Sequence, residues 1–275
     1  MNDAPLSFGQ LLRGWRNRRS LSQLALAAEA EISQRHLSFI ESGRSVPSRE
    51  MILRLGKSLD VPLRERNVLL VSAGFAPVYK ERRPDDPSIK SVTAAVTSIL
   101  RGHEPFPALA LDRHWTMLDA NRAIDPLIAG ADEKLLRPPV NVLRLSLHPD
   151  GLAPRILNFR EWRAHVLDRL SRQIGNAADP ILIGLRDELG AYPVPPGTKP
   201  WRPGEHPAFA GIAVPLQLKC YDRPLSFLSA TTVFGSAYDI RLSELTIETF
   251  LPADKQTMNF LVAAHGDTAA PLDAG

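Results

Sequence analysis

Residues 21–47 read LSQLALAAEAEISQRHLSFIESGRSVP, and this stretch predicts two short helices joined by a tight turn. Ser22 can begin the first helix and Ser33 the second, because a serine oxygen accepts a hydrogen bond from a free N–H group of the first turn. Gly43 can end the second helix, since glycine readily takes the left-handed conformation past a helix terminus. The side chains that helical spacing places on the buried side are Leu24, Ala25, Ala28, Leu37 and Ile40.

The opposite side of the second helix carries Gln34, Arg35, Ser38 and Phe39. A helix that only packs on a core normally has charged, solvated residues there. Gln and Arg side chains instead make bidentate contacts with base edges, and an apolar ring can meet a thymine methyl group. Gln23 can donate to a phosphate where the first helix crosses the DNA backbone. The two helices therefore predict binding to double-stranded DNA. The alternative is a helical bundle that uses these residues only for packing and solvation.

Helix signals continue on both sides of this stretch. Apolar residues recur at helical spacing from Phe8 to Trp15, before the two helices. Pro47-Ser48 can open a fourth helix, and Pro62 suits the first turn of a fifth that ends near Gly74. We therefore expect an all-α domain of five helices over residues 1–78.

The segment from Leu21 to Gly43 resembles the helix-turn-helix of the phage-repressor-like (XRE) transcriptional regulators. The matching features are Ser22-Gln23, Ala27, Ile32 in the turn, Ser33-Gln34, and Ile40-Glu41-Ser42-Gly43 followed by Arg44 and Pro47. The resemblance implies a phosphate contact for Gln23 and a major-groove position for the helix that begins at Gln34. Glu31 stands where many relatives have glycine in the turn. The residues that we predict to contact DNA are Gln23, Ser33, Gln34, Arg35, Ser38, Phe39 and Arg44.

Residues 79–88 (YKERRPDDPS) are charged, contain proline and lack periodicity, so they predict a linker between two domains. The alternative is a surface loop within one domain. We expect a second domain over residues 89–266 and a flexible tail over residues 267–275, which are small and polar.

The second domain mixes helix and strand patterns. Helices are expected over residues 89–100, 121–129, 159–174 and 180–189, and short strands over residues 108–112 and 116–119. From Ile212 to Tyr221 apolar residues alternate with other residues, as in a strand, and further strands are expected over residues 225–234 and 245–251. Because the last three strands are consecutive, they predict an antiparallel meander in an α+β domain, with the helices on one face.

This half of the chain resembles the PAS-like ligand-binding domain of the MmyB-like regulators. The segments that carry the resemblance are residues 73–77, 103–107, 111–115, 120–121, 232–235 and 250–254. The resemblance implies a small apolar ligand, of the fatty-acid kind, held between the sheet and the helices. Since ligand pockets are mostly apolar and lined by aromatic side chains, the candidate pocket residues are Trp115, Trp162, Phe227 and Phe234. The alternative for each of them is plain core packing.

Motifs of catalysis and of metal binding do not occur in the sequence. HExxH, CxxC, GxSxG, GxGxxG and Walker patterns are all missing, so we predict no catalytic residue and no metal. Cys220 lies on the apolar phase of a strand and is expected to be a buried, inert thiol. Asp239, Glu244 and Glu248 are expected at a solvated sheet edge.

The chain as a whole fits a cytoplasmic regulator. Residues 1–80 carry 12 Lys and Arg against 7 Asp and Glu, whereas residues 81–275 carry 21 against 23, so the basic surplus lies where DNA is expected. A single cysteine and the lack of any long apolar run favour the cytoplasm and no membrane.

We expect a sequence-specific transcriptional regulator that acts as a homodimer, because paired recognition helices reach successive major grooves about 34 Å apart. Two alternatives are a C-terminal half that only dimerises and a catalytic PAS-like domain fused to a DNA-binding module.

Overall fold

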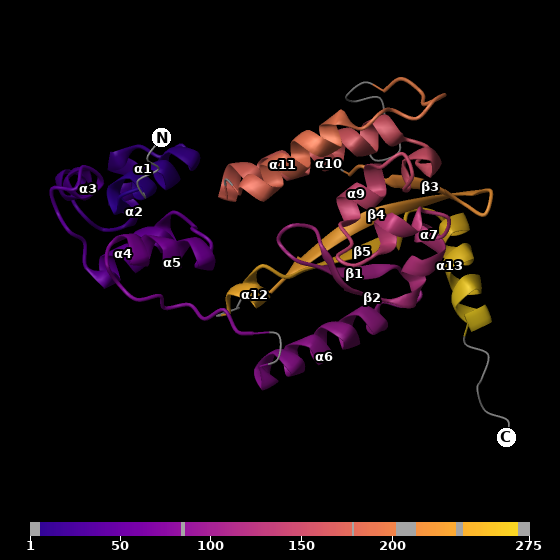
Figure 1. Cartoon of the computed structure of the whole chain (residues 1–275), viewed down its shortest axis with the longest axis horizontal. Coiled ribbons are helices and arrows are strands. Elements are labelled where there is room, and N and C mark those ends of the chain that lie inside the picture. Colours follow the sequence, from indigo (N-terminus) through magenta and orange to yellow (C-terminus); the bar gives the residue numbers. More distant parts are fainter. Residues whose placement is uncertain (1–5, 84–85, 178, 202–212, 235–238, 269–275) are drawn as a thin grey trace. The chain divides into compact units, whose positions relative to one another are not determined.

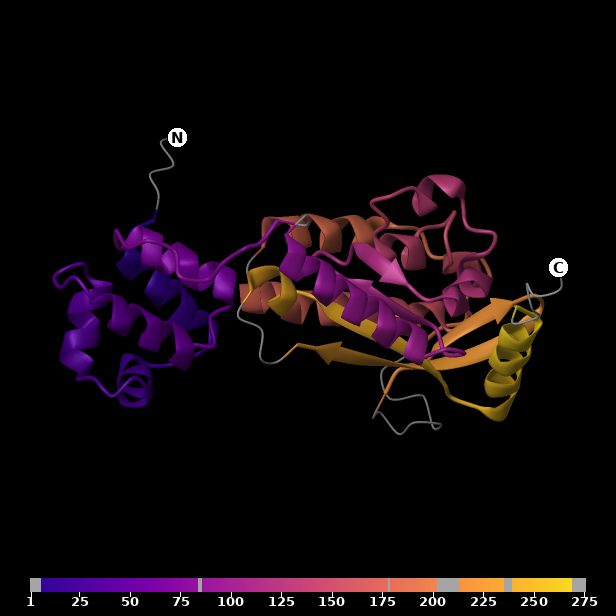
Figure 2. The same ribbon diagram turned by 90° about the horizontal axis from the view of Figure 1, so that it is seen from below.

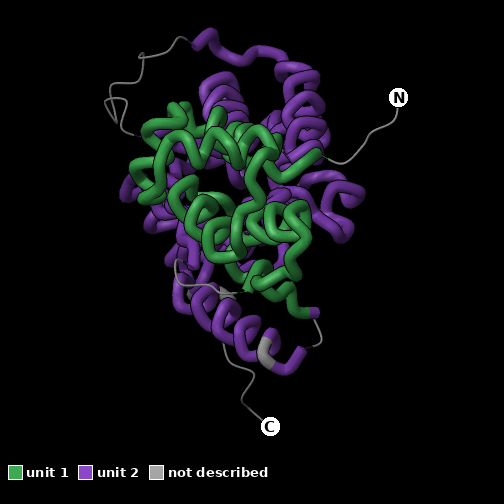
Figure 3. The backbone as a smooth tube through the Cα atoms, turned by 90° about the vertical axis from the view of Figure 1, so that its left-hand side faces the viewer, with its two compact units in different colours: residues 1–82, 175–177, 236–243 green, residues 83–174, 178–235, 244–275 purple. Residues whose placement is uncertain are grey.

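The structure is a computed structural model that describes residues 6–83, 86–177, 179–201, 213–234 and 239–268 (Figure 1). The chain forms two compact units (Figure 3). The first unit holds residues 1–82, 175–177 and 236–243, and the second holds the rest. In the described part of the chain, no helix has the length and apolar character needed to cross a membrane.

The first unit contains the expected five helices. They are α1 (Phe8–Arg18), α2 (Gln23–Glu29), α3 (Gln34–Glu41), α4 (Arg49–Ser58) and α5 (Leu63–Ser72). The side-chain oxygens of Ser7, Ser22, Ser33 and Ser48 each accept a hydrogen bond from a backbone N–H group in the first turn of α1 to α4. These caps define where the helices begin, and they include Ser22 and Ser33, which the sequence predicted.

The core of the first unit confirms the orientation predicted for α3 and corrects the one for α2. Leu37 and Ile40 are fully buried. In α2, however, the buried side chains are Leu26 and Ala27, whereas Leu24 is 63% exposed. Leu24 and Leu26 lie about 200° apart around a helix of 3.6 residues per turn. The face predicted to be buried, which contained Leu24, is therefore the exposed face of α2.

Two backbone positions determine how these helices pack. Glu31, in the turn between α2 and α3, has a φ of 54°, a left-handed conformation that favours glycine. Gly9 of α1 lies against the end of α3, where a Cβ atom would stand only 2.5 Å from the carbonyl oxygen of Glu41. The close approach of α1 and α3 therefore depends on the missing side chain of Gly9.

The segment Asp239–Ser243, which includes the short helix α12 (Ile240–Ser243), belongs to the first unit. Asp239 forms a β-bridge with Lys80, and its carboxylate accepts hydrogen bonds from the N–H groups of Arg82 at 3.2 Å and Arg241 at 2.9 Å. The expectation that Asp239 lies at a solvated edge is wrong, because these contacts leave it only 8% exposed.

The second unit is built on one antiparallel sheet flanked by helices. Its elements are α6 (Pro87–Gly102), β1 (Ala108–Leu111), β2 (Met117–Ala120), η1 (Arg122–Ile124), α7 (Asp125–Ile128), α8 (Glu133–Leu136), α9 (Val142–Leu147), η2 (Ala153–Arg155), α10 (Phe159–Ala177), α11 (Pro180–Ala191), β3 (Leu216–Cys220), β4 (Arg223–Val233), β5 (Thr246–Pro252) and α13 (Lys255–Thr268). The last residues of α10, 175–177, group with the first unit. Residues 269–275 of the predicted tail lie outside the described residues.

The strand order is β2-β1-β5-β4-β3, and every neighbouring pair is antiparallel. The predicted meander of the last three strands is confirmed, with Phe227 of β4 opposite Leu216 of β3 and Pro252 of β5. Because β1 pairs with the far side of β5, β5 lies inside the sheet. Glu248 is therefore on an inner strand and 4% exposed, and its predicted place at a solvated edge is wrong.

Helices cover both faces of the sheet, which corrects the expectation of one. Ala108 and Ala110 of β1 pack with Val96 and Leu100 of α6, while Leu109 and Leu111 belong to a larger cluster with α9 and α10. Figures 1 and 2 show α6 on one side of the strands and α9 and α10 on the other. All four residues of β1 are buried, as expected of a strand covered on both sides.

Candidate functional site

The predicted DNA-reading residues lie along α3 and its ends. Gln34 and Arg35 are exposed, and Ser38 is half-buried. Ser33 is exposed, but its oxygen accepts a hydrogen bond from the N–H of His36 at 3.1 Å and so caps the helix. This leaves the hydroxyl proton of Ser33 available to donate.

The ring of Phe39 in α3 contacts the guanidinium groups of two arginines, Arg35 and Arg44. Its ring centroid lies 5.4 Å from the Cζ of Arg35 and 5.3 Å from the Cζ of Arg44, within the range of cation–π attraction. The backbone supports this arrangement, since the N–H of Arg44 donates to the carbonyl oxygen of Phe39 at 2.8 Å. Two exposed guanidinium groups therefore stand over one half-buried aromatic ring, next to the exposed face of α3.

Gln23, at the start of α2, donates from Nε2 to Oε2 of Glu41 at 2.8 Å. Glu41 ends α3, and its side chain is fully buried. Arg16 of α1 donates to the same carboxylate from Nε at 2.6 Å and from Nη2 at 3.0 Å. Burial alone would raise the pKa of Glu41, but the hydrogen bonds from Arg16 and Gln23 and the charges of Arg16 and Arg13 outweigh it, so the pKa is lowered.

This network ties three helices together at the predicted DNA surface. The sequence pattern indicated Gln23 and included Glu41 in the helix end, but it gave no role to Arg16. The only sequence signal for the network was an acidic residue, Glu41, directly after the predicted core residue Ile40. Since the Gln23 amide has a second N–H, its contact with Glu41 fixes the side chain and leaves one donor for a phosphate.

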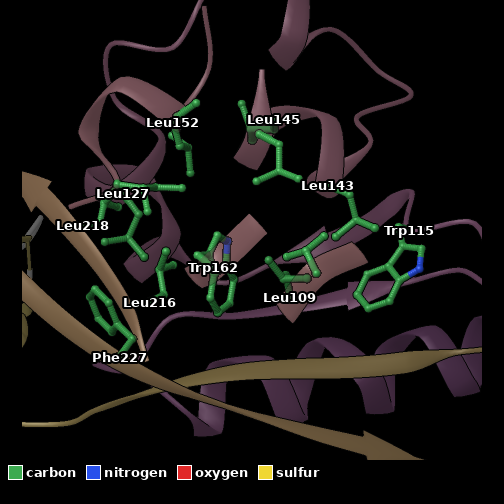
Figure 4. Close-up of a cluster of buried hydrophobic side chains, with 14 of the residues drawn as sticks. Leu109, Trp115, Leu127, Leu143, Leu145, Leu152, Trp162, Leu216, Leu218 and Phe227 are labelled. Carbon is green, nitrogen blue, oxygen red and sulfur yellow. The ribbon is translucent and has the colours of Figure 1, made fainter. Parts of the chain in front are cut away.

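The second unit contains an apolar cavity between the sheet and the helices α7, α9 and α10. Its free volume is about 90 Å³. Leucines make up much of its wall, among them Leu109, Leu111, Leu143, Leu145, Leu216 and Leu218. Figure 4 shows several of these side chains turned toward one another from strands and helices. A space of this size exceeds the roughly 10–15 Å³ that one water molecule needs.

The four aromatic residues predicted for a pocket lie in three different places. Trp115 and Trp162 line the cavity. Phe227 is fully buried in the same cluster and makes an edge-on contact with Phe250, which does line the cavity. Phe234 packs with the cluster beneath α6, on the other face of the sheet.

Trp115 is held in the cavity wall by a constrained loop. Its backbone has a φ of 67°, which is rare for a bulky residue, and its indole Nε1 donates to Oε1 of Gln173 at 2.8 Å. The Oδ1 atom of Asp112 accepts hydrogen bonds from the N–H groups of His114 and Thr116, both at 2.8 Å, and so closes the loop around Trp115. A strained residue held by its surroundings at a cavity is typical of a ligand site.

Arg169 of α10 and Glu248 of β5 form an ion pair in the cavity wall, which sequence reasoning missed. Nη1 and Nη2 of Arg169 lie 2.7 and 2.8 Å from the two carboxylate oxygens, and Nη2 also donates to Oγ1 of Thr231 at 2.7 Å. The Cζ atom lies 4.5 Å from the centroid of the Trp115 ring system. The sequence carried no signal for this pair, because its two members are far apart in the chain.

His165 and Ser146 complete the polar part of the wall. His165 stacks on Trp162 at a centroid distance of 5.5 Å, and burial together with the charges of Arg169 and Arg172 lowers its pKa. Ser146 accepts a hydrogen bond from Nε1 of Trp162 at 3.0 Å. In the described ranges, no group of three or more His, Cys, Asp and Glu is placed to hold a metal ion. Cys220 is fully buried, and burial raises the pKa of its thiol.

Two known protein families match the chain, one over each unit that holds a candidate site. Residues 92–263, more than half of the chain, match the MmyB-like transcription regulator ligand binding domain. The chain belongs to this family. Residues 7–69 match a helix-turn-helix domain. The chain therefore combines a helix-turn-helix domain with an MmyB-like transcription regulator ligand binding domain.

No curated protein matches the chain. One solved structure, an RNA-binding light-oxygen-voltage receptor, is 12% identical with a TM-score of 0.27, over 96% of this chain and 65% of the receptor chain. This MmyB-like chain thus spans about 65% of the length of that receptor.

Proposed function

We propose that the protein is a homodimeric, sequence-specific regulator whose MmyB-like domain senses a small apolar, fatty-acid-like molecule. The observation that carries the proposal is an apolar cavity in a chain that also exposes Gln34 and Arg35 on a helix-turn-helix. Trp115 and Trp162 are the predicted residues that line this cavity, and we assign them the ligand contacts. Phe227 supports the wall through Phe250.

On the DNA side, we propose that Gln34, Arg35 and Ser38 meet base edges and that Gln23 and Arg44 meet phosphates. The exposure of α3 and the pairing of Gln23 with Glu41 support these roles. Ser33 and Phe39 lie at the same surface, with Phe39 orienting the two arginines. One such module contacts a single half-site, so tight binding calls for two copies about 34 Å apart on the duplex.

We propose residues 1–78 as the DNA-binding domain, 79–88 as the linker and 89–266 as the ligand-binding domain. The family matches at residues 7–69 and 92–263 support these limits. The segment Asp239–Ser243 is an addition to this division, because it packs with the first unit.

The test is to purify the full chain under native conditions, extract it with organic solvent and identify what is released by mass spectrometry. We expect a lipid-like molecule in about one copy per protomer. Trp162→Ala, which removes a cavity wall, should lower that amount, whereas Leu24→Ala on the exposed side of α2 should not. No bound molecule would favour a domain that only dimerises, and a chemically altered molecule would favour an enzyme.

A further inference from the structure

The polar part of the cavity wall is already electrically neutral before any ligand enters. Arg169 and Glu248 neutralise each other through two short contacts, at 2.7 and 2.8 Å. The side chain of Glu248 is only 6% exposed and that of Arg169 is 25% exposed, so water screens the pair weakly. His165, the neighbouring titratable group on α10, favours its neutral form because burial lowers its pKa.

The elements packed against this pair bring no further charge into the cavity. Leu109 of β1 and Thr231 of β4 stand opposite Glu248 in the sheet, and Ser146 of α9 lines the same space. Arg172 of α10 lowers the pKa of His165, and Asp168 of the same helix raises it. These two residues form an ion pair with each other at 3.0 Å, and both side chains are 67% exposed. The only charges in the cavity lining are therefore Arg169 and Glu248, among the described residues.

We propose that Glu248, by neutralising Arg169, selects ligands whose polar end is uncharged when bound: an alcohol, an ester, an amide or a carboxylic acid that keeps its proton. The inference rests on the proposed function, that an apolar small molecule occupies this cavity. A bound carboxylate would share one guanidinium with Glu248, and two carboxylates a few ångströms apart in a poorly solvated site repel each other strongly. An ammonium group would be repelled by the positive charge of Arg169, and the carboxylate of Glu248 is already paired with that arginine.

Donors for an uncharged polar end remain available. Arg169 uses three of its five N–H groups, on Glu248 and Thr231, and within the described part of the chain its other two have no acceptor. The Ser146 hydroxyl accepts from Trp162 and can donate its own proton. A hydroxyl or carbonyl oxygen of the ligand can accept from these groups without separating Arg169 from Glu248.

The experiment compares decanoic acid, 1-decanol and decylamine by titration calorimetry on the lipid-free full chain. Decanoic acid in water is ionised at pH 6–8, since an ordinary carboxyl has a pKa near 4. We expect it to bind with uptake of about one proton, measured from buffers of different ionisation enthalpy, and its Kd to rise about tenfold per pH unit. The Kd of 1-decanol should stay constant and be the lowest of the three at pH 8.

Three variants locate the effect. Glu248→Gln should abolish the proton uptake and strengthen acid binding at pH 8 by tenfold or more, because Arg169 is then unpaired. His165→Gln should keep the proton uptake. Glu188→Gln is the matched control, since it breaks the Arg144–Glu188 ion pair, with contacts of 2.7 to 3.0 Å, outside the cavity, and should behave as wild type.

The outcomes separate this inference from the proposed function. Tight binding of the acid without proton uptake in the wild type would overturn the inference and leave the sensor intact. Proton uptake that disappears in His165→Gln and persists in Glu248→Gln would also overturn it. If none of the three compounds binds, the proposed ligand class fails as well. Should Glu248→Gln fail to fold, the wild-type proton count still decides.

Discussion

The amide nitrogen of Gln23 lies 2.8 Å from the carboxylate of Glu41, so the start of α2 is joined to the end of α3. Glu41 is buried and also receives two hydrogen bonds from Arg16. The residue expected to reach a phosphate and the helix expected to read bases are therefore held in one arrangement. This arrangement depends on a buried negative charge.

Replacing Glu41 with Gln should destabilise the first unit by about 3 kcal/mol, because Arg16 is left with an uncompensated charge in a largely buried place. Amide hydrogen exchange in α1 to α3 at increasing urea concentration measures the change in the first unit. Glu29→Gln, on the exposed side of α2, is the control and should change stability little. The pKa of Glu41 is lowered in the folded chain, so its stabilising effect is present above the pKa of an unfolded Glu and declines as the pH falls below it. Equal loss in both variants would show that the network does not stabilise the unit.

Arg35→Ala and Gln34→Ala should each remove about 1–3 kcal/mol of discrimination at one or two base pairs, since each side chain can make a bidentate base contact. Gln23→Ala should weaken binding evenly across sequences, as expected of a phosphate contact. Affinities for single-base variants of a selected duplex measure both effects. If Arg35→Ala weakens every duplex equally, Arg35 contacts a phosphate and the assignment is wrong.

Leu37→Ala or Ile40→Ala should destabilise the first unit by about 2–5 kcal/mol, because each change removes buried surface and leaves a cavity. Both residues are buried in the first core. The comparison is Leu24→Ala, at a leucine that is 63% exposed, which should change the unfolding free energy by less than about 0.5 kcal/mol. A Leu24→Ala variant as unstable as Leu37→Ala would contradict the orientation of α2.

Glu31→Gly should stabilise the first unit by about 0.5–1 kcal/mol, because glycine removes the strain of a left-handed residue and its added flexibility offsets only part of the gain. The thermal midpoint of the first unit measures the change. Gly43→Ala is the reverse test, since Gly43 has a φ of 74° after α3, and it should lower the midpoint. A midpoint that falls in Glu31→Gly would mean that the Glu31 side chain contributes a contact larger than its backbone strain.

A ligand that regulates DNA binding must shift the DNA affinity by about 1–3 kcal/mol, and DNA must shift the ligand affinity by the same factor. Titrating 1-decanol with and without a selected duplex, and the duplex with and without 1-decanol, measures both sides of the cycle. Trp162→Ala should remove the ligand dependence and leave DNA binding by the ligand-free chain unchanged. A ligand that binds without changing either affinity is a structural lipid.

Local sequence signals were enough to predict the first unit. Serine caps and helical spacing involve residues a few positions apart, so Ser22, Ser33, Leu37 and Ile40 were placed correctly. The rotation of α2 was missed because seven residues rich in alanine and leucine fit more than one buried face. The base contacts remain predictions, since exposure alone does not show what a side chain touches.

In the second unit, the sequence predicted the pairing of strands that are neighbours in the chain, and it missed the pairing of strands that are far apart. The meander from β3 to β5 follows from consecutive strands. The pairing of β1 with β5, which buries Glu248, joins segments far apart in the chain and leaves no local pattern. The helices α8, α9 and α12 have four to six residues each, too few for a period to appear, and α13 was not predicted.

The segment Asp239–Ser243 lies between two strands of the ligand-binding unit in the sequence but belongs to the DNA-binding unit in space. The polypeptide leaves the first unit after Arg82, and both the end of α10 and Asp239–Ser243 contribute to that unit again. A hybrid regulator that carries only residues 1–78 on a foreign sensor would lack Lys80 and the segment that hydrogen-bonds to it. Engineers who exchange sensors on this scaffold therefore have to preserve the short segment between β4 and β5 as well as the junction before α6.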